Sequence, residues 1–511
     1  MGLPEDELDG VAIQGSTWSA ADFGPHVDLP LAISERISYR FPFPRQTGEV
    51  TVPILVTMPD TDVPFLDEPG AGFPVIIYQP ALTQDRSAIL PMAVAAGLLC
   101  AGDDDVDDCF VTVAIDPPLH GIFPGFEGAV SDAESEDNTS GNPGMFSVDD
   151  QRENNPENSR PGDATRERHF GFGTNDAMKA VPASTLDEPG SGDLFLNFTN
   201  FANTQGNIRQ SVMDALNLNA SLTAIADAIA ACVSCDDSFG IDTSRVYFLT
   251  HSLSGMGGVA VPHLTNLAIE AGNEALNPIQ GQAFMNTGGH FSRVLENSRD
   301  LAPELLPGLD DASEGLLAQG RTELNLYLNI LQGILDQVDP ANYAASYSDT
   351  DTMLTAIVGD GTLDNCASME PERVTADCTV PNAADRDLFL QGPLDLADLM
   401  LEDGTVFPIQ SLPAPLAGTD PLARLMGAGN VLNDDSGRPF ISLFSKGAHG
   451  NPISAGQGDQ DPGSSEDVFS IMAIQMLQTF QGEDPDNFEG RDEEGLISDE
   501  DRAAQVAEDD E

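Results

Sequence analysis

One stretch, residues 246–258, constrains the fold of this chain more than any other segment. Its sequence is VYFLTHSLSGMGG, an apolar run that leads directly into Ser252 and then into glycines suited to a helix start. Only small neighbours tolerate the strained backbone of a sharp strand-to-helix turn, and such a turn leaves a serine hydroxyl exposed at the end of a sheet. The stretch predicts a buried strand, a tight turn and a candidate nucleophile at Ser252.

The turn departs from the common nucleophile pattern G-x-S-x-G. Thr250 and Ser254 occupy the two positions that are usually glycine, and three glycines follow by position 258. The alternative interpretation is a serine in an ordinary strand-to-helix turn. Partners elsewhere in the chain have to decide between the two.

Short apolar runs alternate with helical segments along the chain. Residues 73–79 and 110–116 are continuous apolar runs, and a helix is expected between them at 86–99. Further strands are expected at 245–249, 283–286, 353–358 and 439–444, and further helices at 207–231 and 465–480. Buried strands that alternate with helices are typical of a parallel sheet with right-handed crossovers. The predicted fold class is α/β, with a mostly parallel central sheet and helices on both faces.

The two ends of the chain differ in composition from the middle. Residues 1–70 are rich in Pro, Asp and Gly, and β-type patterning at 36–40 and 49–57 predicts extra strands, antiparallel, at the edge of the sheet. Residues 483–511 hold 14 acidic residues among 29 and almost no apolar pattern. That composition predicts a disordered, solvating tail.

The remaining residues, 71–482, are expected to form one catalytic domain that carries two insertions. The first insertion, at about 117–200, contains a long polar stretch with little periodicity. The second, at about 290–350, is helical in pattern and rich in leucine. Long excursions inside a compact domain are usually caps or functional loops, so a cap or lid is predicted here.

The charge balance excludes one class of partner. The chain has 84 acidic and 21 basic residues, a formal net charge of −63. Phosphate backbones require the opposite sign, so nucleic acid is not expected as a partner. Self-repulsion on this scale is tolerated where counter-ions screen it, which predicts a salt-adapted protein.

Cysteine spacing and the absence of a long apolar run indicate the compartment. Six cysteines form three sequence-local pairs: Cys100 with Cys109, Cys232 with Cys235, and Cys366 with Cys378. This predicts three short disulfide staples in an exported protein, with free buried thiols as the alternative. The first residues lack a secretory signal pattern and no apolar run is long enough to cross a bilayer. We expect a mature, secreted or cell-surface protein without a transmembrane segment.

A serine nucleophile needs a histidine to take its proton and an acid to orient that histidine. His449 lies just after the strand predicted at 439–444, in a small-residue loop with the sequence SKGAHGN. It is the preferred candidate for the base, and the alternative interpretation is a histidine on a surface loop. His290 comes too soon after Ser252 to leave room for an acid between them, so it is expected to line the pocket.

The acid is expected in the loop after the strand at 353–358. Asp377 is preferred because a disulfide between Cys366 and Cys378 would fix its loop. Asp360 and Asp364 in the same loop are the alternatives.

A hydrolytic site of this kind also needs N–H donors for a developing oxyanion. The residue after the nucleophile, Leu253, is expected to provide one. Leu82 is the second candidate, in the loop that follows the strand at 73–79, because Pro80 has no N–H to donate.

Two acidic clusters, at 102–108 and 359–365, are candidates for calcium loops. The first lacks the glycine at position six and the glutamate at position twelve of an EF-hand loop. In so acidic a chain these clusters are expected to be solvated loops, and no metal or cofactor is predicted.

Several segments together resemble the bacterial extracellular virulence-factor lipases, a lysophospholipase-like branch of the α/β-hydrolases. They are FPVIIYQ at 73–79, VAIDPPLHG at 113–121, NIRQS at 207–211, DTSRVYFLTHSL at 242–253 and DCTVPN at 377–382. The resemblance spans most of residues 50–450 and follows the order of the family. It implies an α/β-hydrolase fold and a fatty-acyl ester substrate such as a lysophospholipid or another lipid ester.

The chain departs from that family at two places. The first strand is followed by Pro80 and Ala81 where the family has His-Gly, and the turn reads THSLSG where the family has GHSLGG. The sequence thus predicts a secreted serine carboxylesterase or lipase with Ser252, Asp377 and His449 as its triad. A serine peptidase and a catalytically silent binding protein on a hydrolase fold are the alternatives.

Overall fold

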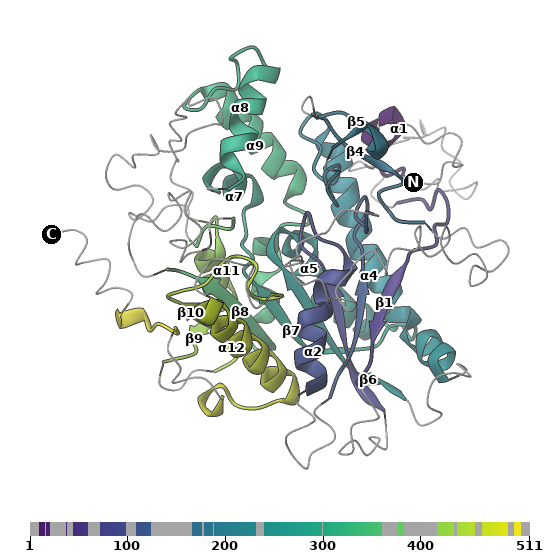
Figure 1. Cartoon of the computed structure of the whole chain (residues 1–511), viewed down its shortest axis with the longest axis vertical. Helices are drawn as coiled ribbons and strands as arrows, with labels where there is room; N and C mark the ends of the chain where they lie inside the picture. Colours follow the sequence, from purple (N-terminus) through teal and green to yellow (C-terminus); the bar gives the residue numbers. More distant parts are fainter. Residues whose placement is uncertain are drawn as a thin grey trace, which may run out of the picture.

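A computed structural model describes most of the chain, in ranges separated by gaps. The described residues are 10–15, 17–20, 37, 44–59, 72–98, 109–123, 166–175, 178–187, 189–230, 240–298, 300–359, 377, 379–382, 416–433, 437–454, 462–488 and 495–501. The elements in these ranges surround one central sheet, which carries the core (Figure 1).

Eight strands of the described residues form this sheet, in the order β1-β3-β2-β6-β7-β8-β10-β9. Their bounds are β1 (Ile54–Thr57), β2 (Phe73–Gln79), β3 (Val111–Ile115), β6 (Ile241–His251), β7 (Ile279–Met285), β8 (Asp351–Ile357), β9 (Gly429–Asn430) and β10 (Phe440–Phe444). β1 pairs antiparallel with β3, and the other neighbours pair parallel. The predicted α/β class and the antiparallel edge strand are confirmed. The strand predicted at 36–40 lies, apart from residue 37, outside the described residues.

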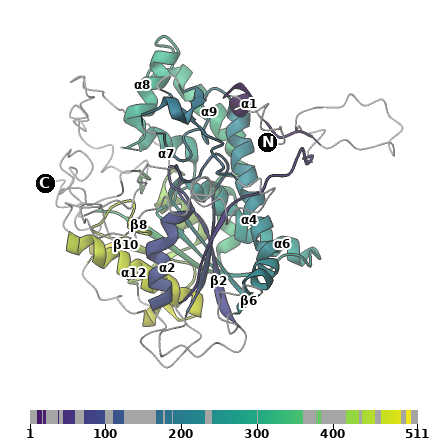
Figure 2. The same ribbon diagram turned by 45° about the vertical axis from the view of Figure 1, so that its right-hand side comes forward.

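Helices cover both faces of the sheet, which explains why its central strands are continuous apolar runs. One face packs against α4 (Phe201–Ala230), α6 (Ala260–Glu270) and α11 (Thr419–Met426), and the other against α2 (Leu90–Leu98) and α12 (Pro462–Gln481). Figure 2 shows α4 and α6 on the opposite side of the sheet from α2. Because side chains alternate along a strand, Val75 and Ile77 join the first core, and Ile76 and Tyr78 join the second.

A third apolar cluster forms a cap at the carboxyl ends of the strands. The leucine-rich stretch folds into α7 (Phe291–Asn297), α8 (Ala302–Ala312) and α9 (Thr322–Leu335), seen at the top of Figure 1. Their buried leucines pack with Leu253 of the strand-to-helix turn and with Leu82, which is partly buried. The cap therefore lies directly against the two loops in which the sequence predicts N–H donors.

The described end of the first insertion forms a small unit of its own. After the 124–165 gap, β4 (Phe172–Thr174) and β5 (Ala180–Pro182) pair as a two-stranded antiparallel sheet. Helix α1 (Gly10–Gly15) lies beside β5 (Figure 1).

Helix α4 is longer than its apolar pattern predicts, beginning at Phe201 rather than at residue 207. Its first turns are polar but buried, because their side chains find hydrogen-bond acceptors on other segments. Asn203 donates to the Ile13 carbonyl at 3.1 Å, and Asn207 donates to the Phe195 carbonyl at 2.9 Å. Satisfied polar groups can be buried without a hydrophobic signature, so periodicity alone misses this end of the helix.

The described part of the acidic C-terminal segment packs on the body, which corrects the prediction of a solvated tail from residue 483. Phe488 and Ile497 are buried. Ser445 N–H donates to the Gly495 carbonyl at 2.7 Å, and Ile497 N–H donates to the Leu443 carbonyl at 3.0 Å. β9 pairs only with Phe440 and Ile441 of β10. Residues 495–497 pair with the rest of the outer edge of β10.

The strand order, the antiparallel edge strand and the turn after the central strand β6 are those of the α/β-hydrolase fold. Among the described residues, no helix is both long and apolar enough to cross a membrane. Cys109 is disulfide-bonded. The other five cysteines lie outside the described residues, so the three predicted pairings stay predictions.

Candidate active site

Ser252 sits at the turn between β6 and a short helical segment, as its sequence context predicts. It follows His251, the last residue of β6, and its backbone is left-handed, with φ 62°. A left-handed non-glycine residue is strained, and it persists where its surroundings fix it. The serine is buried, at 3% exposed, which corrects the expectation of an exposed side chain at this turn. The local geometry is that of a nucleophile elbow.

The two departures from G-x-S-x-G form a pair across this turn. Thr250 Oγ1 and Ser254 Oγ lie 2.9 Å apart, and both residues are buried. Ser254 Oγ also donates to the His251 carbonyl at 2.7 Å. The two hydroxyl groups therefore occupy the positions that are glycine in the common pattern, and their hydrogen-bonding capacity is satisfied there.

Two of the following glycines make room for this arrangement. A methyl group on Gly258 would lie 2.7 Å from Thr250 Oγ1. A methyl group on Gly255 would lie 2.0 Å from Thr287 Oγ1, on the loop after β7. In the common pattern the glycines beside the serine allow its neighbours to pack closely. Here Gly255 and Gly258 allow the close packing instead.

His449 reaches Ser252 from the loop after β10. Its Nδ1 lies 2.7 Å from Asp377 Oδ2, and its Nε2 lies 2.6 Å from Ser252 Oγ. A carboxylate only accepts hydrogen bonds, so Nδ1 carries the proton and Nε2 accepts from the serine hydroxyl. The structure brings the three predicted residues into one hydrogen-bonded line.

Asp377 is held by the backbone around it and is 2% exposed. Its N–H donates to the carbonyl of Ile357, the last residue of β8, at 3.0 Å. Its Oδ1 accepts the N–H groups of Thr379 and Val380 at 2.9 and 2.8 Å, which leaves Oδ2 for His449. The alternatives Asp360 and Asp364 lie outside the described residues.

His290 takes a different position from His449. It lies on the loop after β7 with left-handed backbone, φ 61°, and its N–H donates to Asp339 Oδ1 at 3.0 Å. Burial lowers the pKa of its imidazole below the ordinary value. Its predicted place in a pocket wall stays a prediction.

The loop after β2 carries the second predicted N–H donor, Leu82. A turn forms at residues 82 and 83, where Thr83 is left-handed with φ 68°. Leu82 and Leu253 both pack with the apolar cluster that forms the cap. Their N–H groups as oxyanion donors stay a prediction.

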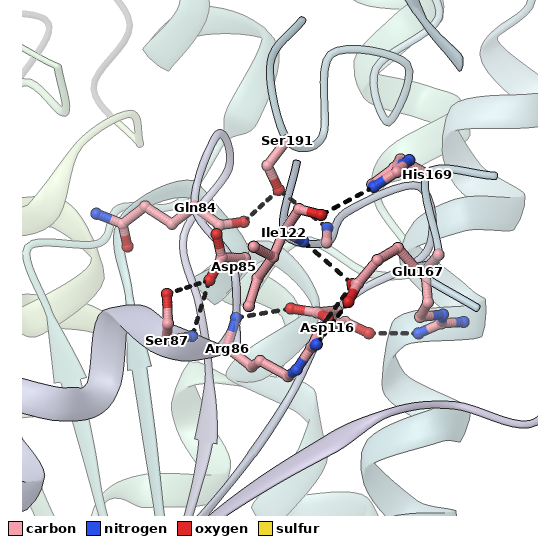
Figure 3. Close-up of polar contacts among 11 residues, drawn as sticks. Gln84, Asp85, Arg86, Ser87, Asp116, Ile122, Glu167, His169 and Ser191 are labelled. Carbon is pink, nitrogen blue, oxygen red and sulfur yellow. Dashed lines mark hydrogen bonds and ion pairs between the residues drawn. The ribbon is translucent and has the colours of Figure 1, made fainter. Parts of the chain in front are cut away.

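A buried ionic cluster of Arg86, Asp116 and Glu167 anchors the loop after β2 (Figure 3). The sequence did not predict this cluster. Arg86 N–H donates to Asp116 Oδ1 at 2.6 Å, and the guanidinium also binds Asp116 Oδ2. Two guanidinium nitrogens of Arg86 each donate to Glu167 at 2.7 Å. The cluster thus joins the loops after β2 and β3 to the segment that returns from the first insertion.

Burial controls the protonation of this cluster. Desolvation raises the pKa of Asp116 to about 6, although the neighbouring Arg86 opposes the shift. Burial lowers the pKa of Arg86, but the facing Asp116 and Glu167 carboxylates raise it, with a net result above the ordinary value. Arg86 therefore stays charged, while Asp116 titrates in a mildly acidic range.

The cluster is tied to neighbouring backbone as well. Ile122 N–H donates to Glu167 Oε2 at 3.1 Å, and Ser191 Oγ donates to the Gln84 carbonyl at 2.7 Å (Figure 3). A methyl group on Gly121 would lie 2.6 Å from Glu167 Oε2. Acidic residues occur throughout this chain, so nothing in the local sequence marks Asp116 and Glu167 as partners of Arg86. Only the fold reveals the cluster.

The two acidic clusters considered for calcium remain untested. Residues 102–108 lie outside the described residues, as do residues 360–365 of the second cluster.

No protein-family model and no curated protein sequence matches this chain. Among solved structures it is similar to the acylaminoacyl peptidase of Pyrococcus horikoshii, with 10% identity and a TM-score of 0.37 over 86% of this chain and 40% of the peptidase. It is also similar to esterase LipW from Mycobacterium marinum (11%, 0.34, covering 84% and 77%) and to a lipase in an open form (11%, 0.33, covering 84% and 94%). At these TM-scores, the fold class rests on the sheet order and the elbow rather than on the likeness.

Proposed function

We propose that this chain is a serine ester hydrolase of the carboxylesterase or lipase type, working through an acyl-enzyme. One observation carries the proposal: Asp377, His449 and Ser252 form a continuous hydrogen-bonded line, with distances of 2.7 and 2.6 Å. This is the arrangement in which a histidine can take a serine proton while a carboxylate holds its ring.

Each residue would have a distinct role in the reaction. Ser252 Oγ attacks the ester carbonyl as His449 Nε2 takes its proton, and Asp377 stabilises the imidazolium that forms. His449 then gives the proton to the leaving alcohol. A water molecule, activated by the same histidine, releases the acid and regenerates Ser252. The N–H groups of Leu253 and Leu82 are the proposed donors to the oxyanion of both tetrahedral intermediates.

The cap supports an apolar acyl group as the substrate class. The leucines of α7, α8 and α9 form one cluster with Leu82 and Leu253, the residues whose N–H groups are the proposed oxyanion donors. Apolar side chains beside a reacting carbonyl favour an apolar acyl chain. A lipid ester or lysophospholipid is the substrate that we propose. The enzyme is proposed to act outside the cell that makes it.

A p-nitrophenyl ester assay on wild type and Ser252→Ala tests the proposal. We expect Ser252→Ala to lower kcat by about a thousandfold or more with an unchanged melting temperature, because the nucleophile is lost without a change in packing. Ser221→Ala is the control, an exposed serine on α4, and should keep wild-type turnover. Equal turnover in wild type and Ser252→Ala would contradict the proposal.

Two further measurements separate the alternatives. A fluorophosphonate probe should label wild type and leave Ser252→Ala unlabelled, whereas a silent binding protein would leave both unlabelled. A panel of p-nitroanilide peptides beside the esters would identify a peptidase, since peptidases use the same three residues.

A further inference from the structure

The backbone carbonyl of His449 is bound by two side chains from other strands. His251 Nε2 lies 2.8 Å from this oxygen, and Asn286 Nδ2 donates to it at 3.0 Å. His251 ends β6 and Asn286 directly follows β7, so two adjacent strand ends converge on the residue proposed as the base.

The His251 contact fixes the state of that imidazole. A carbonyl oxygen only accepts, so Nε2 carries the proton and donates it. Its Nδ1 is buried and has no hydrogen-bond partner among the described residues. Burial, and next the charge of His449, lower the pKa of His251 to about 3. His251 therefore stays neutral while His449, whose ring centroid is 4.9 Å away, takes a proton.

Asn286 is itself held in one orientation. It is buried and left-handed, with φ 46°. Its Oδ1 accepts from Thr355 Oγ1 at 2.9 Å, and its N–H donates to the Thr355 carbonyl at 3.2 Å. With Oδ1 directed to β8, the amide nitrogen faces His449.

The loop around His449 is also held by hydrogen bonds of its own: Ala448 N–H donates to Asn451 Oδ1, and the N–H groups of Ile453 and Ser454 both donate to the Gly450 carbonyl at 3.1 Å. Glycines flank His449 at 447 and 450, and Gly447 is left-handed with φ 124°. Within the described part of the loop, Asn451 N–H donates to the Ala448 carbonyl at 3.0 Å. These hydrogen bonds shape the turn itself, whereas those of His251 and Asn286 join His449 to the ends of two strands of the sheet. The His449 ring has to stay within hydrogen-bond distance of both Ser252 and Asp377.

We propose that His251 and Asn286 are positioning residues, which set the place of the His449 ring by binding its backbone carbonyl. The inference rests on the proposed function of Ser252 and His449. Neither side chain is required to touch substrate. Their contribution is to hold the base in the reactive geometry before substrate binds.

The test separates the donor from the shape of each side chain. His251→Leu removes the donor, whereas His251→Gln keeps an N–H at about the place of Nε2. Asn286→Asp keeps the size and the left-handed preference of the residue but replaces the donor by an acceptor. Melting temperatures and circular dichroism establish that each variant is folded. If His251→Leu does not fold, the near-isosteric Asn286→Asp decides.

We expect His251→Leu and Asn286→Asp to lower kcat by about ten- to a hundredfold on a p-nitrophenyl ester, with KM within about twofold, because a displaced base affects the chemical step. His251→Gln should restore kcat to within about fivefold of wild type. The double variant should lose little more than the worse single variant, since both act on one carbonyl. Unchanged kcat in both folded single variants, or an equal loss in His251→Gln and His251→Leu, would overturn the proposal.

A second measurement does not depend on turnover. An imidazole N–H that donates to a carboxylate gives a far-downfield proton resonance, which reports the contact of His449 with Asp377. We expect this signal in wild type, Ser252→Ala and His251→Gln, and its loss or broadening in His251→Leu and Asn286→Asp. If wild type shows no more turnover than Ser252→Ala, the proposed function fails, and this signal alone decides the positioning role. A signal retained in all variants would then reject it.

Discussion

The left-handed backbone of Ser252 depends on how closely its neighbours can pack. Thr250 and Ser254 bind each other across the turn, and Gly255 lies against Thr287 where a side chain would collide. The turn is therefore stabilised by the paired hydroxyl groups of Thr250 and Ser254. It also depends on Gly255, which stands one residue later than the glycine of the common pattern. Any added volume at Gly255 should be transmitted directly to the serine.

We expect Gly255→Ala to destabilise the protein by about 1–3 kcal/mol, because the new methyl group overpacks a buried site. It should also lower ester turnover, since relief of the clash has to move the elbow. The control is Gly333→Ala, in α9, where a methyl group would meet nothing within 4 Å. That variant should gain about 0.5–1 kcal/mol and keep wild-type turnover. Urea unfolding and the ester assay measure both, and equal stability of the two variants would contradict the packing argument.

Ser252, Asp377 and His449 could be selected from the sequence because each follows a recognisable apolar strand. Parallel strands bring their carboxyl ends to one edge of a sheet, so strand order supplies the spatial argument. The contacts of His251 and Asn286 with His449 could not be found in this way. They join positions 198 and 163 residues apart, and no local pattern encodes such a contact.

At the scale of elements, the Arg86–Asp116–Glu167 cluster joins loops that the sheet alone leaves separate. It fixes the start of the helical segment after Leu82, so the loop of the second proposed N–H donor is held by charge as well as by packing. Replacing Arg86 would remove the guanidinium that both buried carboxylates face, so this residue is the hardest of the three to replace.

The titration of Asp116 gives this cluster a pH signature. Its pKa is raised from 3.8 to about 6, so the folded state holds a proton that the unfolded state releases between these values. The contribution of this group to stability is therefore complete below about pH 4 and is lost as pH rises through about 6. Relative to Asp116→Asn, wild type should lose about 3 kcal/mol of unfolding free energy over that range and then stay level.

Urea unfolding of both proteins at constant ionic strength, at intervals from pH 4 to pH 8, measures this difference. Other titrating groups largely cancel in the comparison. A difference that instead grew in favour of wild type as pH rises would show that attraction to Arg86 outweighs the cost of burying the Asp116 carboxylate.

The elements that the sequence predicts best are those buried on both faces. β2 has the predicted bounds, and β10 differs by one residue at its start, because a continuous apolar run has clear ends. β6 and β7 each begin four residues before their predicted starts, because polar residues and glycine interrupt the apolar pattern there. The first turns of α4 and the C-terminal contacts with β10 were missed. Both are stabilised by hydrogen bonds with distant segments, to which hydrophobic periodicity is blind.

At the scale of the whole molecule, the charge of −63 opposes folding while the apolar clusters favour it. Mutual repulsion among surface carboxylates is lower in the expanded chain than in the compact one. Salt screens this repulsion, with a Debye length of about 10 Å at 0.1 M and about 3 Å at 1 M. The balance should therefore shift towards the folded state as salt rises.

We expect the melting temperature to rise by about 5–10 °C between 0.05 and 2 M KCl. KCl is preferred to a sulfate salt, because sulfate also stabilises proteins by exclusion from their surface. Sucrose at matched osmolality is the control and should give a smaller rise. Equal melting temperatures at low and high KCl would remove the idea of salt adaptation.

The contact of residues 495–497 with β10 links the far end of the chain to the proposed base. β10 runs into the loop that holds His449, and Ser445, the first residue after the strand, is bound by Gly495. If the chain were ended at Gln481, where the last long helix ends, the second half of β10 would lose its hydrogen-bonding partners on the outer edge. For anyone shortening the protein or fusing a tag to it, residues 495–497 belong with β10, and a cut should lie beyond Asp499, which accepts a hydrogen bond from Asn430 of β9 at 3.3 Å.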